Sequence, residues 1–427
     1  MDGTATPFSQ KQAIDTIRVL SIDAIQQANS GHPGAPMGAA PMTYALWTGF
    51  LKHAPTRPDW LDRDRFVLSA GHASMLLYSM LHLTGYDLPL EELKRFRQMG
   101  SLTPGHPEFG LTAGVEATTG PLGQGFANAV GMAIAERRLA AEFNKPGHEI
   151  VDHFTYTICS DGDLQEGIAS EAASLAGHLG LGKLIALYDD NDIQLDGPTD
   201  MAWSEDVLAR FEAYGWHTQR VADGEDVAAI SAALEAARAD GRPSIISVKT
   251  IIGAGSPNKA GTHKVHGAPL GAEEVAATKA ALGFDPEASF DIAPAVLDHF
   301  REAAESGAEL VSAWEGRLAA YTTAYPAEGA ELRRRIDGTL AEGWDAELPW
   351  YSTGDDGIAT RNASKNAING LKDGVPELIG GSADLSGSNL TDIADGGVFS
   401  AHESGRNIRY GVREHAMGGI ANGIAYH

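Results

Sequence analysis

The chain has 427 residues and carries 32 basic and 57 acidic side chains, which gives a formal net charge of −25 at pH 7. So acidic a balance argues against nucleic acids and anionic membranes as general partners, although a local basic pocket can still bind a phosphorylated substrate. The length allows two or three domains with sizeable cores, and 50 glycines with 43% hydrophobic residues are typical of a glycine-rich α/β enzyme.

The sequence contains no apolar run of about eighteen residues, so we expect no membrane-spanning segment. Its first residues lack the basic-then-apolar pattern of a signal peptide. The single cysteine, Cys159, excludes an intrachain disulfide and fits a reducing compartment, so we expect a cytoplasmic protein in which Cys159 is an inert core residue.

Several histidines lie in rigid turns or beyond predicted strands. The first predicted helix follows the N-cap residue Ser9 and ends before the turn SGHPG, which holds His32. A predicted strand at residues 65–69 ends just before His72, and SLTPGHP frames His106. One histidine in a turn is usually solvated, but this recurrence predicts a cluster over one site, where imidazoles can move protons or stabilise an alkoxide.

Two glycine-rich segments occur elsewhere in the chain. Residues 118–125 open a predicted helix, where glycines can cradle a phosphate, but the signal is weak because close helix–sheet packing also requires glycine. A predicted buried strand at residues 243–250 leads into a second glycine loop, and the segment KAGTHKVHGAP then adds His263 and His266 to the set of histidines.

The middle of the chain reads as strand, helix, strand. The strand at residues 154–159 stops at Ser-Asp-Gly, and the strand at 184–188 ends in Asp-Asp-Asn-Asp. Polar residues at the carboxyl ends of neighbouring parallel strands are placed where open α/β sheets bind ligands. Asp161 and Asn191 offer oxygen ligands that suit Mg²⁺ or Ca²⁺, and Gly162 allows a phosphate to approach. The alternative is that both strand ends carry only solvated turn residues.

The alternation of strands and helices from about residue 60 to 255 predicts one doubly wound parallel α/β sheet. Residues 286–350 are rich in alanine and glutamate and predict peripheral helices with breaks at Gly307 and Pro326. A second, similar α/β pattern begins near Thr360, with a helix at 363–371, a strand at 377–381 and a helix at 416–426. Taken alone, the Arg-Glu-His before that last helix is typical of a charged surface turn.

These segments are similar to those of transketolases, a family of thiamine diphosphate-dependent enzymes. The similarity begins with SDGDLQEG at residues 160–167 and the asparagine at the end of the next strand, which together resemble the thiamine diphosphate motif. Ser160 stands where the family usually has glycine, a position that contributes a turn and no ligand. The resemblance implies that Asp161, Asn191 and the backbone carbonyl of Ile193 hold a divalent ion (Mg²⁺, Ca²⁺ or Mn²⁺), which holds the cofactor's diphosphate.

Other segments extend the resemblance along the chain: SGHPGAPMG, SAGHASMLLY, SLTPGHPE, HKVHGAPLG, GSADLSGSNLTD and IRYGVREHAMGGIANGIA. In the family, the histidines line the approach to the thiazolium carbon and contact the sugar; the matching positions are His32, His72, His106 and His266, with His263 given less weight. The positions that the resemblance assigns to the cofactor are His72, Gly120, Leu122, Gly162, Glu166, Asn191, His266, Asp384 and Glu414.

The second part of the chain matches further functional positions. Glu414 matches the glutamate that hydrogen-bonds the aminopyrimidine ring and so turns the cofactor into a carbanion nucleophile. Arg361 and Ser388 match contacts to the acceptor's phosphate, for which arginine is suited by its bidentate geometry. Asp384 matches a residue near the cofactor across a dimer. Glu166 with Glu171 matches a carboxylate network between two sites.

The resemblance implies a transketolase of the pentose phosphate pathway, which transfers a two-carbon ketol group reversibly from a ketose phosphate, such as xylulose 5-phosphate, to an aldose phosphate, such as ribose 5-phosphate. It also implies a homodimer with the active site between subunits. Dihydroxyacetone synthase is the nearest alternative, and 1-deoxyxylulose-5-phosphate synthase fits less well because it lacks two of the histidine motifs. The non-catalytic alternative is a fragment that only binds cofactor or dimerises.

The domain organisation follows from the same resemblance. We expect a diphosphate- and metal-binding domain at residues 1–320, an inter-domain linker at 321–355 and a pyrimidine-binding domain from 356 to 427. The chain stops in an apolar helical pattern at His427 without a glycine cap, so we expect a fragment in which the pyrimidine-binding domain is truncated. Such a fragment is expected to have little or no turnover alone.

Overall fold

A five-stranded parallel sheet forms the centre of the structure, a computed structural model that describes residues 8–427. The strand order is β1-β2-β3-β5-β4, and every neighbouring pair is parallel. The strands are β1 (Arg65–Leu68), β2 (Thr155–Ser160), β3 (Leu184–Asp190), β4 (His217–Val221) and β5 (Ser244–Lys249). The predicted doubly wound parallel α/β sheet is therefore confirmed.

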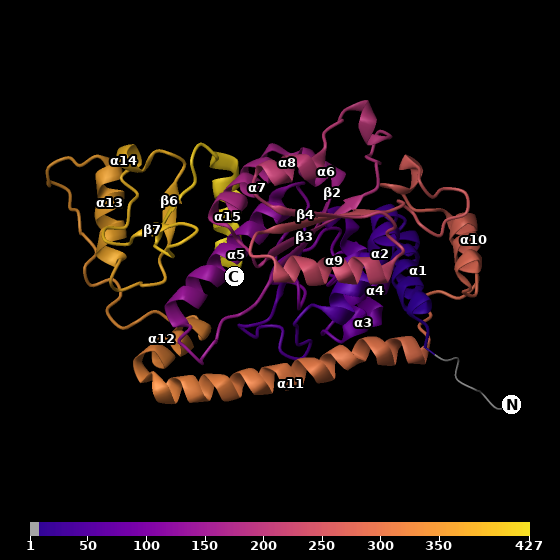
Figure 1. The fold of residues 1–427 in the computed structure, drawn as a ribbon, viewed down its shortest axis with the longest axis horizontal. Coiled ribbons are helices and arrows are strands. Elements are labelled where there is room, and N and C mark those ends of the chain that lie inside the picture. The colour runs from indigo at the N-terminus through magenta and orange to yellow at the C-terminus, as the bar shows by residue number, and fades with distance from the viewer. Residues whose placement is uncertain (1–7) are drawn as a thin grey trace.

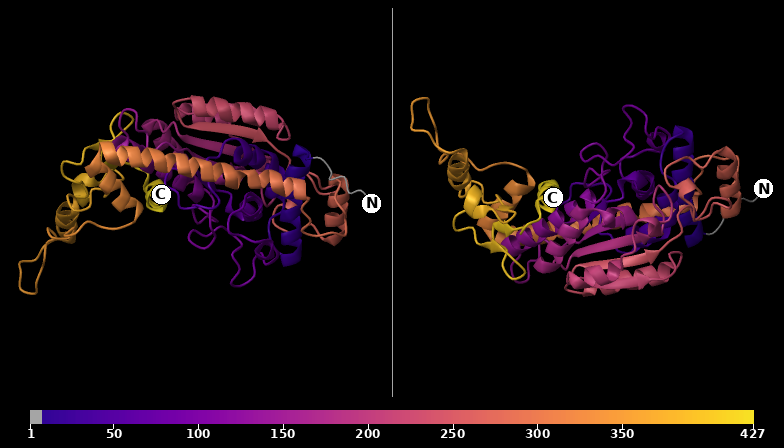
Figure 2. Two further views of the ribbon diagram at one scale, coloured as in Figure 1. Left: turned by 90° about the horizontal axis from the view of Figure 1, so that it is seen from below. Right: turned by 90° about the horizontal axis from the view of Figure 1, so that it is seen from above.

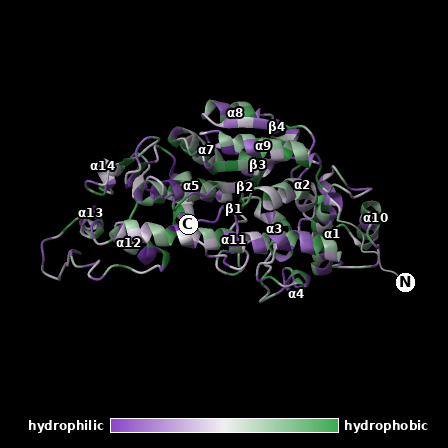
Figure 3. Cartoon of the chain, turned by 60° about the horizontal axis from the view of Figure 1, so that its bottom comes forward, coloured by the Kyte–Doolittle hydropathy of each residue, from purple (hydrophilic) through white to green (hydrophobic). Residues whose placement is uncertain are grey.

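Helices cover both faces of this sheet, which is why its strands are nearly continuous apolar runs. In β3, Ile185 and Leu187 enter one core and Leu184 and Ala186 enter the other. The first core is completed mainly by α1 (Gln10–Ala28), α2 (Gly34–Gly49), α3 (Ser74–Thr84) and α9 (Val227–Ala239). The second is completed mainly by α5 (Gln124–Phe143), α7 (Gly167–Leu179) and α8 (Val207–Ala213). Figure 3 shows hydrophobic residues gathered around β3 in the middle of the fold.

Short helices occupy the loops around the sheet. They are α4 (Leu90–Lys94), α6 (Asp161–Gln165), α10 (Ala272–Leu282) and the 3₁₀ turns Gly71–Ala73, Thr199–Met201 and His263–Val265. Helix α6 was not predicted from the sequence; it begins immediately after β2 and turns the chain before α7. Ser9 occupies the N-cap position of α1 as predicted, but its side chain makes no capping hydrogen bond.

The long helix α11 (Pro294–Ala324) corrects a prediction, because it runs unbroken through Gly307. A Cβ at Gly307 would lie 2.6 Å from the carbonyl oxygen of His53 and 2.7 Å from Cα of Ala54. This glycine therefore permits close packing and does not end the helix. The predicted break at Pro326 is confirmed, since α12 (Pro326–Ile336) begins there. Figures 1 and 2 show α11 lying along one side of the molecule toward the second unit.

The second unit holds a smaller parallel sheet with the order β6-β8-β7. Its elements are α13 (Thr360–Leu371), β6 (Gly380–Ser382), α14 (Ser386–Asn389), β7 (Val398–Phe399), β8 (Asn407–Arg409) and α15 (Glu414–Tyr426). The predicted second α/β pattern is confirmed, although its first strand lies at β6 and not at 377–381, and its last helix begins at Glu414. Among residues 8–427 the structure contains no helix that could cross a membrane.

Helix α15 returns to the first unit and packs against α5 and α7 (Figure 1). Glycine allows the contact to be close: a Cβ at Gly131 of α5 would lie 2.1 Å from the carbonyl oxygen of Ile420. A Cβ at Gly423 would lie 2.0 Å from the carbonyl oxygen of Asn128. The two helices therefore cross backbone to backbone, and side chains larger than hydrogen at these positions would separate them.

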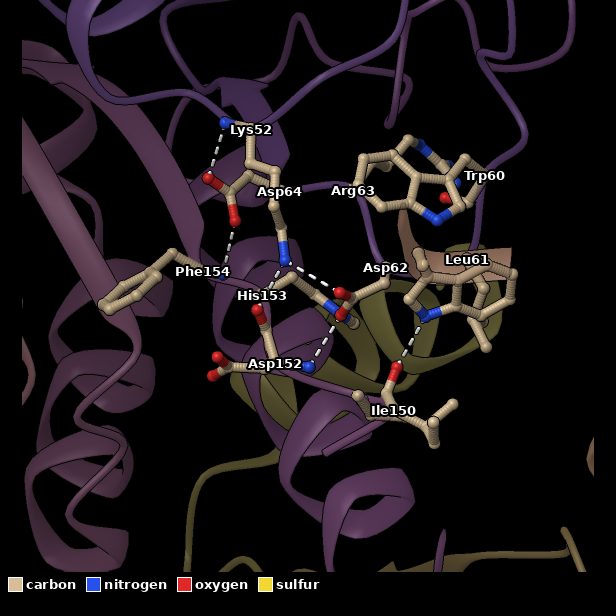
Figure 4. Close-up of polar contacts among 12 residues, drawn as sticks. Lys52, Trp60, Leu61, Asp62, Arg63, Asp64, Ile150, Asp152, His153 and Phe154 are labelled. Atoms are coloured by element: carbon tan, nitrogen blue, oxygen red, sulfur yellow. Dashed lines mark hydrogen bonds and ion pairs between the residues drawn. The ribbon is translucent and has the colours of Figure 1, made fainter. Parts of the chain in front are cut away.

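A buried polar network lies at the amino ends of β1 and β2, at the opposite edge of the sheet from the carboxyl ends of these strands (Figure 4). Asp62 accepts hydrogen bonds from Lys52 Nζ at 2.9 Å and from the Asp152 N–H at 2.6 Å. Asp64 accepts from the N–H groups of Lys52 and Phe154 at 2.8 and 2.7 Å. Buried carboxylates satisfied in this way link segments that are distant in sequence.

Candidate functional site

A cavity of about 700 Å³ lies at the carboxyl ends of β2 and β3, where parallel α/β sheets bind ligands. The structure brings nine of the predicted site residues to its lining: His32, His72, Gly120, Leu122, Gly162, Glu166, Asn191, Ile193 and His266. They come from segments spread over more than half of the chain. The sheet edge therefore assembles the predicted cluster.

Asp161 begins α6 directly after β2 and is buried. Its Oδ1 accepts a hydrogen bond from the Tyr188 hydroxyl at 2.5 Å, whereas its Oδ2 is buried and has no hydrogen-bond partner among residues 8–427. Burial raises the pKa of Asp161 to about 7, with the hydrogen bond from Tyr188 lowering this pKa and the nearby carboxylates of Asp189 and Asp190 contributing to its rise. A buried carboxylate oxygen without a donor is suited to bind a cation.

Asn191 lies just beyond β3, at the strand end adjacent to that of β2. The register pairs Ser160 with Asp189, so the residues that follow both strands leave the sheet side by side. Asn191 Oδ1 accepts from the N–H of Ile193 at 3.0 Å, and its Nδ2 donates to Asp189 at 2.9 Å. This orients the amide oxygen within a tight turn and leaves it a second lone pair.

The predicted metal ligands include one carboxylate, one amide and one backbone carbonyl. Within residues 8–427 no group of three or more histidine, cysteine, aspartate or glutamate residues is arranged to hold a metal ion. The predicted site is of a different kind, because only one of its three ligands is a carboxylate. The donor set of Asp161, Asn191 and Ile193 consists only of oxygens and fits a hard cation such as Mg²⁺ or Ca²⁺.

Four histidines lie close together, and three of them (His32, His72 and His266) line the cavity. The ring centroid of His32 lies 5.2 Å from that of His72, 6.0 Å from His266 and 6.5 Å from His106. The His72 and His266 rings lie 5.3 Å apart and are nearly parallel. The predicted clustering of these turn histidines is therefore confirmed. His263 lies in an exposed 3₁₀ turn and does not line the cavity.

Burial keeps these imidazoles neutral at pH 7. It lowers the pKa of His32 to about 4 and that of His72 to about 3, with smaller contributions from Arg97 and His266 respectively. Burial also lowers the pKa of His106 and His266. A neutral imidazole donates one hydrogen bond and accepts another, so the cluster can contact several hydroxyl groups without carrying net charge. The Nδ1 of His266 is buried without a partner among the described residues.

Close contacts between loops shape the cavity walls. A Cβ at Gly71, beside His72, would lie 2.6 Å from Thr119 Oγ1 and 2.7 Å from the Gly120 nitrogen. Gly120 itself has a φ of +154° and packs against the His106 ring. Gly162 allows Leu122 to approach, since a Cβ there would lie 2.9 Å from Leu122 Cδ1. Glycine is required here for close approach of backbones and side chains.

Six predicted site residues do not line this cavity: Asp161, His106 and four residues of the second unit. Arg361, Asp384, Ser388 and Glu414 belong to the second unit, are exposed, and do not line the pocket. The predicted partner of Glu166 lies apart from it: Glu166 lines the cavity, whereas Glu171 accepts a hydrogen bond from the N–H of Ala416 at 2.9 Å. Within this chain, Glu171 therefore holds the start of α15 against α7.

Several residues of the site were not predicted from the sequence. The cavity is also lined by Ala35, Ser160, Gln165, Asp189, Gln194, Leu195, Asp196, Ala202 and Ile252. Beneath it, Ser160 and Asp163 form a capping box at the start of α6. The spacing of serine and an acidic residue three positions later is a recognisable signal for a helix start, and it could have revealed both α6 and Asp163.

Comparison with known families decides which fold this is. Residues 9–341 match the model of the transketolase thiamine diphosphate binding domain, and residues 356–427 match that of the transketolase pyrimidine binding domain. The chain belongs to the transketolase family. The suspected resemblance is confirmed, and the cavity lies within the part that matches the thiamine diphosphate binding domain.

Individual transketolases are similar over nearly the whole chain. The protein from Geobacillus stearothermophilus is 58% identical over 421 residues, which are 98% of this chain and 63% of the relative. Transketolase 1 from Escherichia coli is 55% identical and covers 98% of this chain and 64% of its own length. A crystal structure of Pichia stipitis transketolase with sedoheptulose 7-phosphate superimposes with a TM-score of 0.95, at 50% identity, over 97% of this chain and 62% of that one. The chain thus spans about 63% of the length of its curated transketolase relatives.

Proposed function

We propose that this chain serves the transketolase reaction, the reversible transfer of a two-carbon ketol group from a ketose phosphate such as xylulose 5-phosphate to an aldose phosphate such as ribose 5-phosphate. One observation carries the proposal. In the part that matches the family's thiamine diphosphate binding domain, Asp161 has a buried carboxylate oxygen with no hydrogen-bond partner among the described residues, and it lies at the same sheet edge as a cluster of neutral imidazoles.

The cofactor site follows from the donors at this edge. Asp161, Asn191 and the carbonyl of Ile193 would hold the divalent ion. Mg²⁺, Ca²⁺ and Mn²⁺ are the candidates, because all three ions bind oxygen ligands of this kind. Gly120, Leu122 and Gly162 would border the diphosphate. The support is the all-oxygen donor set, the free Oδ2 of Asp161 and the close-packed glycines. When bound, thiamine diphosphate supplies a carbanion nucleophile and an electron sink for carbon–carbon bond cleavage and formation.

The histidines would handle the sugar. His32, His106 and His266 are neutral at pH 7, so each can donate a proton to a developing alkoxide or accept one from a hydroxyl group. His72 and His266 stack at the inner side of the cluster and would contact the cofactor. A neutral cluster also avoids the desolvation cost that a charged imidazole would carry in this pocket.

A homodimer would complete the site. Glu414 and Asp384, assigned to the cofactor, and Arg361 and Ser388, assigned to the substrate's phosphate, are exposed and away from this chain's own cavity. They can serve the reaction only if a second copy of the chain brings them to it. Exposed apolar side chains near the cavity support such a contact: Leu195, Met201 and Ile251 are 64%, 67% and 58% exposed.

Two measurements test the proposal. Calorimetric titration of the purified chain with Mg²⁺ and thiamine diphosphate should show saturable binding, and Asp161→Asn should weaken it strongly. In the assay of turnover, xylulose 5-phosphate and ribose 5-phosphate should yield sedoheptulose 7-phosphate. A wild-type chain that binds no cofactor at millimolar concentrations would falsify the assignment. Turnover with formaldehyde as the only acceptor would favour dihydroxyacetone synthase.

A second candidate function is cofactor binding or dimerisation with little or no turnover. It is favoured because the chain spans only 63% of the length of its relatives. Saturable cofactor binding in the titration together with no sedoheptulose 7-phosphate in the turnover assay would support it. Measurable ketol transfer by the purified chain would overturn it. In either case we propose a diphosphate- and metal-binding domain at residues 1–320, a linker at 321–355, a pyrimidine-binding domain at 356–427, and a cytoplasmic location.

A further inference from the structure

We propose that Asp163 is a positioning residue that joins the three loops bordering the cofactor cavity through one buried carboxylate. The inference rests on the proposed function of that cavity and adds a residue that neither contacts the cavity nor serves as a ligand. Asp163 lies in α6 and is 0% exposed.

Four donors occupy the carboxylate of Asp163. Its Oδ1 accepts from the Ser69 hydroxyl at 2.7 Å and from the Gly123 N–H at 2.8 Å. Its Oδ2 accepts from both the N–H and the hydroxyl of Ser160 at 2.9 Å. Each oxygen therefore binds one backbone N–H and one hydroxyl group, and neither is left free for a metal ion. In this respect Asp163 differs from Asp161, whose Oδ2 has no hydrogen-bond partner within residues 8–427.

The three residues that Asp163 contacts belong to different segments of the site. Ser69 follows β1 and precedes His72. Gly123 follows the turn that holds Gly120 and Leu122 and is the N-cap of α5. Ser160 ends β2 and precedes Asp161 and Gly162. These segments lie up to nearly a hundred residues apart in sequence, and Asp163 connects all three (the Ser69 contact alone spans 94 positions).

The connection continues from Ser69 into α5, because the Ser69 hydroxyl oxygen accepts the N–H of Phe126 at 2.9 Å. Gly123 cannot easily shift. It has a φ of +78°, and a Cβ there would lie 2.8 Å from Ile168 Cγ2 and 2.9 Å from Glu166 Cβ. A chain of short hydrogen bonds in a tightly packed place transmits the loss of one acceptor to its neighbours.

Asparagine cannot replace this carboxylate. Its amide offers one oxygen and one NH₂ group, so in either orientation the NH₂ would face a backbone N–H, of Gly123 or of Ser160. Hydroxyl groups can rotate to accept from an NH₂, but a backbone N–H cannot. Asp163→Asn therefore leaves a buried N–H without an acceptor in one of the two cofactor loops, with almost no change in shape.

The test compares Asp163→Asn with Asp62→Asn, made in the full 427-residue chain. Asp62 is a matched control because it is also a buried carboxylate that accepts a backbone N–H, but it lies at the amino ends of the same strands (Figure 4). Ser69→Ala provides a second variant that keeps the carboxylate, should Asp163→Asn fold poorly. The measurements are hydrogen exchange by mass spectrometry without ligand and calorimetric binding of Mg²⁺ with thiamine diphosphate.

We expect Asp163→Asn to lose exchange protection in peptides covering residues 66–73, 119–126 and 155–164 and to bind the cofactor about 10- to 100-fold more weakly, as loss of outer-shell partners does at metal sites. Ser69→Ala should lose protection in the first two segments. Asp62→Asn should lose protection near residues 50–65 and keep wild-type affinity within about twofold, as for a site remote from the ligand.

Unchanged exchange in all three loops of Asp163→Asn, or equal loss of affinity in the Asp62 control, overturns the proposal. Failure of the wild-type chain to bind the cofactor contradicts the proposed function. In that case the hydrogen-exchange comparison of the ligand-free variants alone tests the role of Asp163.

Discussion

Breaking the buried ion pair between Lys279 and Asp23 should destabilise the protein strongly. Lys279 Nζ lies 2.5 Å from Asp23 Oδ1, and both side chains are 2% exposed. The ammonium also donates to the Ala288 carbonyl at 2.6 Å, and Asp23 Oδ2 accepts the Phe290 N–H at 2.8 Å. The pair joins α10, which follows the His266 loop, to α1, which precedes the His32 turn. Two of the segments that carry cavity histidines are thus tied together.

Lys279→Met leaves the Asp23 carboxylate buried with a single hydrogen bond from the backbone. Removal of one partner from a buried pair costs about 3–5 kcal/mol. Burial already raises the pKa of Asp23 although Lys279 lowers it, so the variant's pKa should rise further. Between about pH 4 and this raised pKa, the Asp23 carboxyl keeps its proton in the folded variant but loses it in the unfolded chain. The stability of the variant therefore falls as pH rises through this range. The loss should therefore be larger at pH 8 than at pH 5.

Urea unfolding of the cofactor-free chain, followed by tryptophan fluorescence, measures these losses. The double variant Asp23→Leu with Lys279→Met should recover most of the stability, because neither member leaves an unpaired buried charge. As an exposed control, Arg57→Met removes the pair with Glu315, whose members are 51% and 55% exposed, and should change stability by less than about 1 kcal/mol. A loss below about 1 kcal/mol for Lys279→Met, or a double variant as unstable as the sum of the single variants, would refute the reasoning.

Three further predictions concern the site, acid stability and helix packing. Asp161→Asn should abolish the rise in melting temperature caused by Mg²⁺ with thiamine diphosphate, measured by scanning fluorimetry, without destabilising the metal-free chain; a retained rise contradicts its role as ligand. Burial lowers the pKa of His53 to about 4, so the stability that neutral His53 contributes is fully present above pH 6.5 and is lost as pH falls toward 4; His53→Gln should therefore remove about 2 kcal/mol of the loss between pH 7.5 and 5, while the buried histidines of the cavity keep their own share of it, and an unchanged loss would contradict this account. Gly307→Ala should cost about 1–3 kcal/mol in urea unfolding because its Cβ meets backbone, whereas Gly316→Ala in the same helix meets nothing within 4 Å and should stabilise; equal effects would disprove the packing account.

The two aspartates of α6 have different chemical environments although only one residue separates them. In the part of the chain that the structure describes, Asp161 has a buried oxygen without a hydrogen-bond partner, whereas Asp163 has all its acceptor positions occupied. The first is equipped to take a cation from outside, and the second to hold protein segments together. Asp161→Asn and Asp163→Asn should therefore weaken cofactor binding for different reasons, and only Asp163→Asn should disturb the loops in the ligand-free chain.

The order of the elements and the location of the site were readable from the sequence because both depend on local patterns. Apolar runs of strand length that end in Ser-Asp-Gly and Asp-Asp-Asn-Asp predicted β2 and β3, and parallel strands bring such ends to one edge. Glycine and proline around His32 and His106 likewise predicted rigid turns, which the fold then brought together. Family-specific motifs, and not periodicity, pointed to the cofactor.

Contacts between distant segments were decided only by the tertiary structure. Gly307 has the local signature of a helix break, yet the helix continues because the glycine is needed where α11 meets His53 and Ala54. Glu414 was assigned to the same site as the histidines, but α15 packs on α5 and leaves it outside the cavity of its own chain. The spacing from Ser160 marks Asp163 only as a helix-capping residue, since its role in joining the loops comes from donors that only folding brings within hydrogen-bond distance. Local patterns encode backbone conformation and burial, whereas the partner of a buried polar group depends on how the whole chain packs.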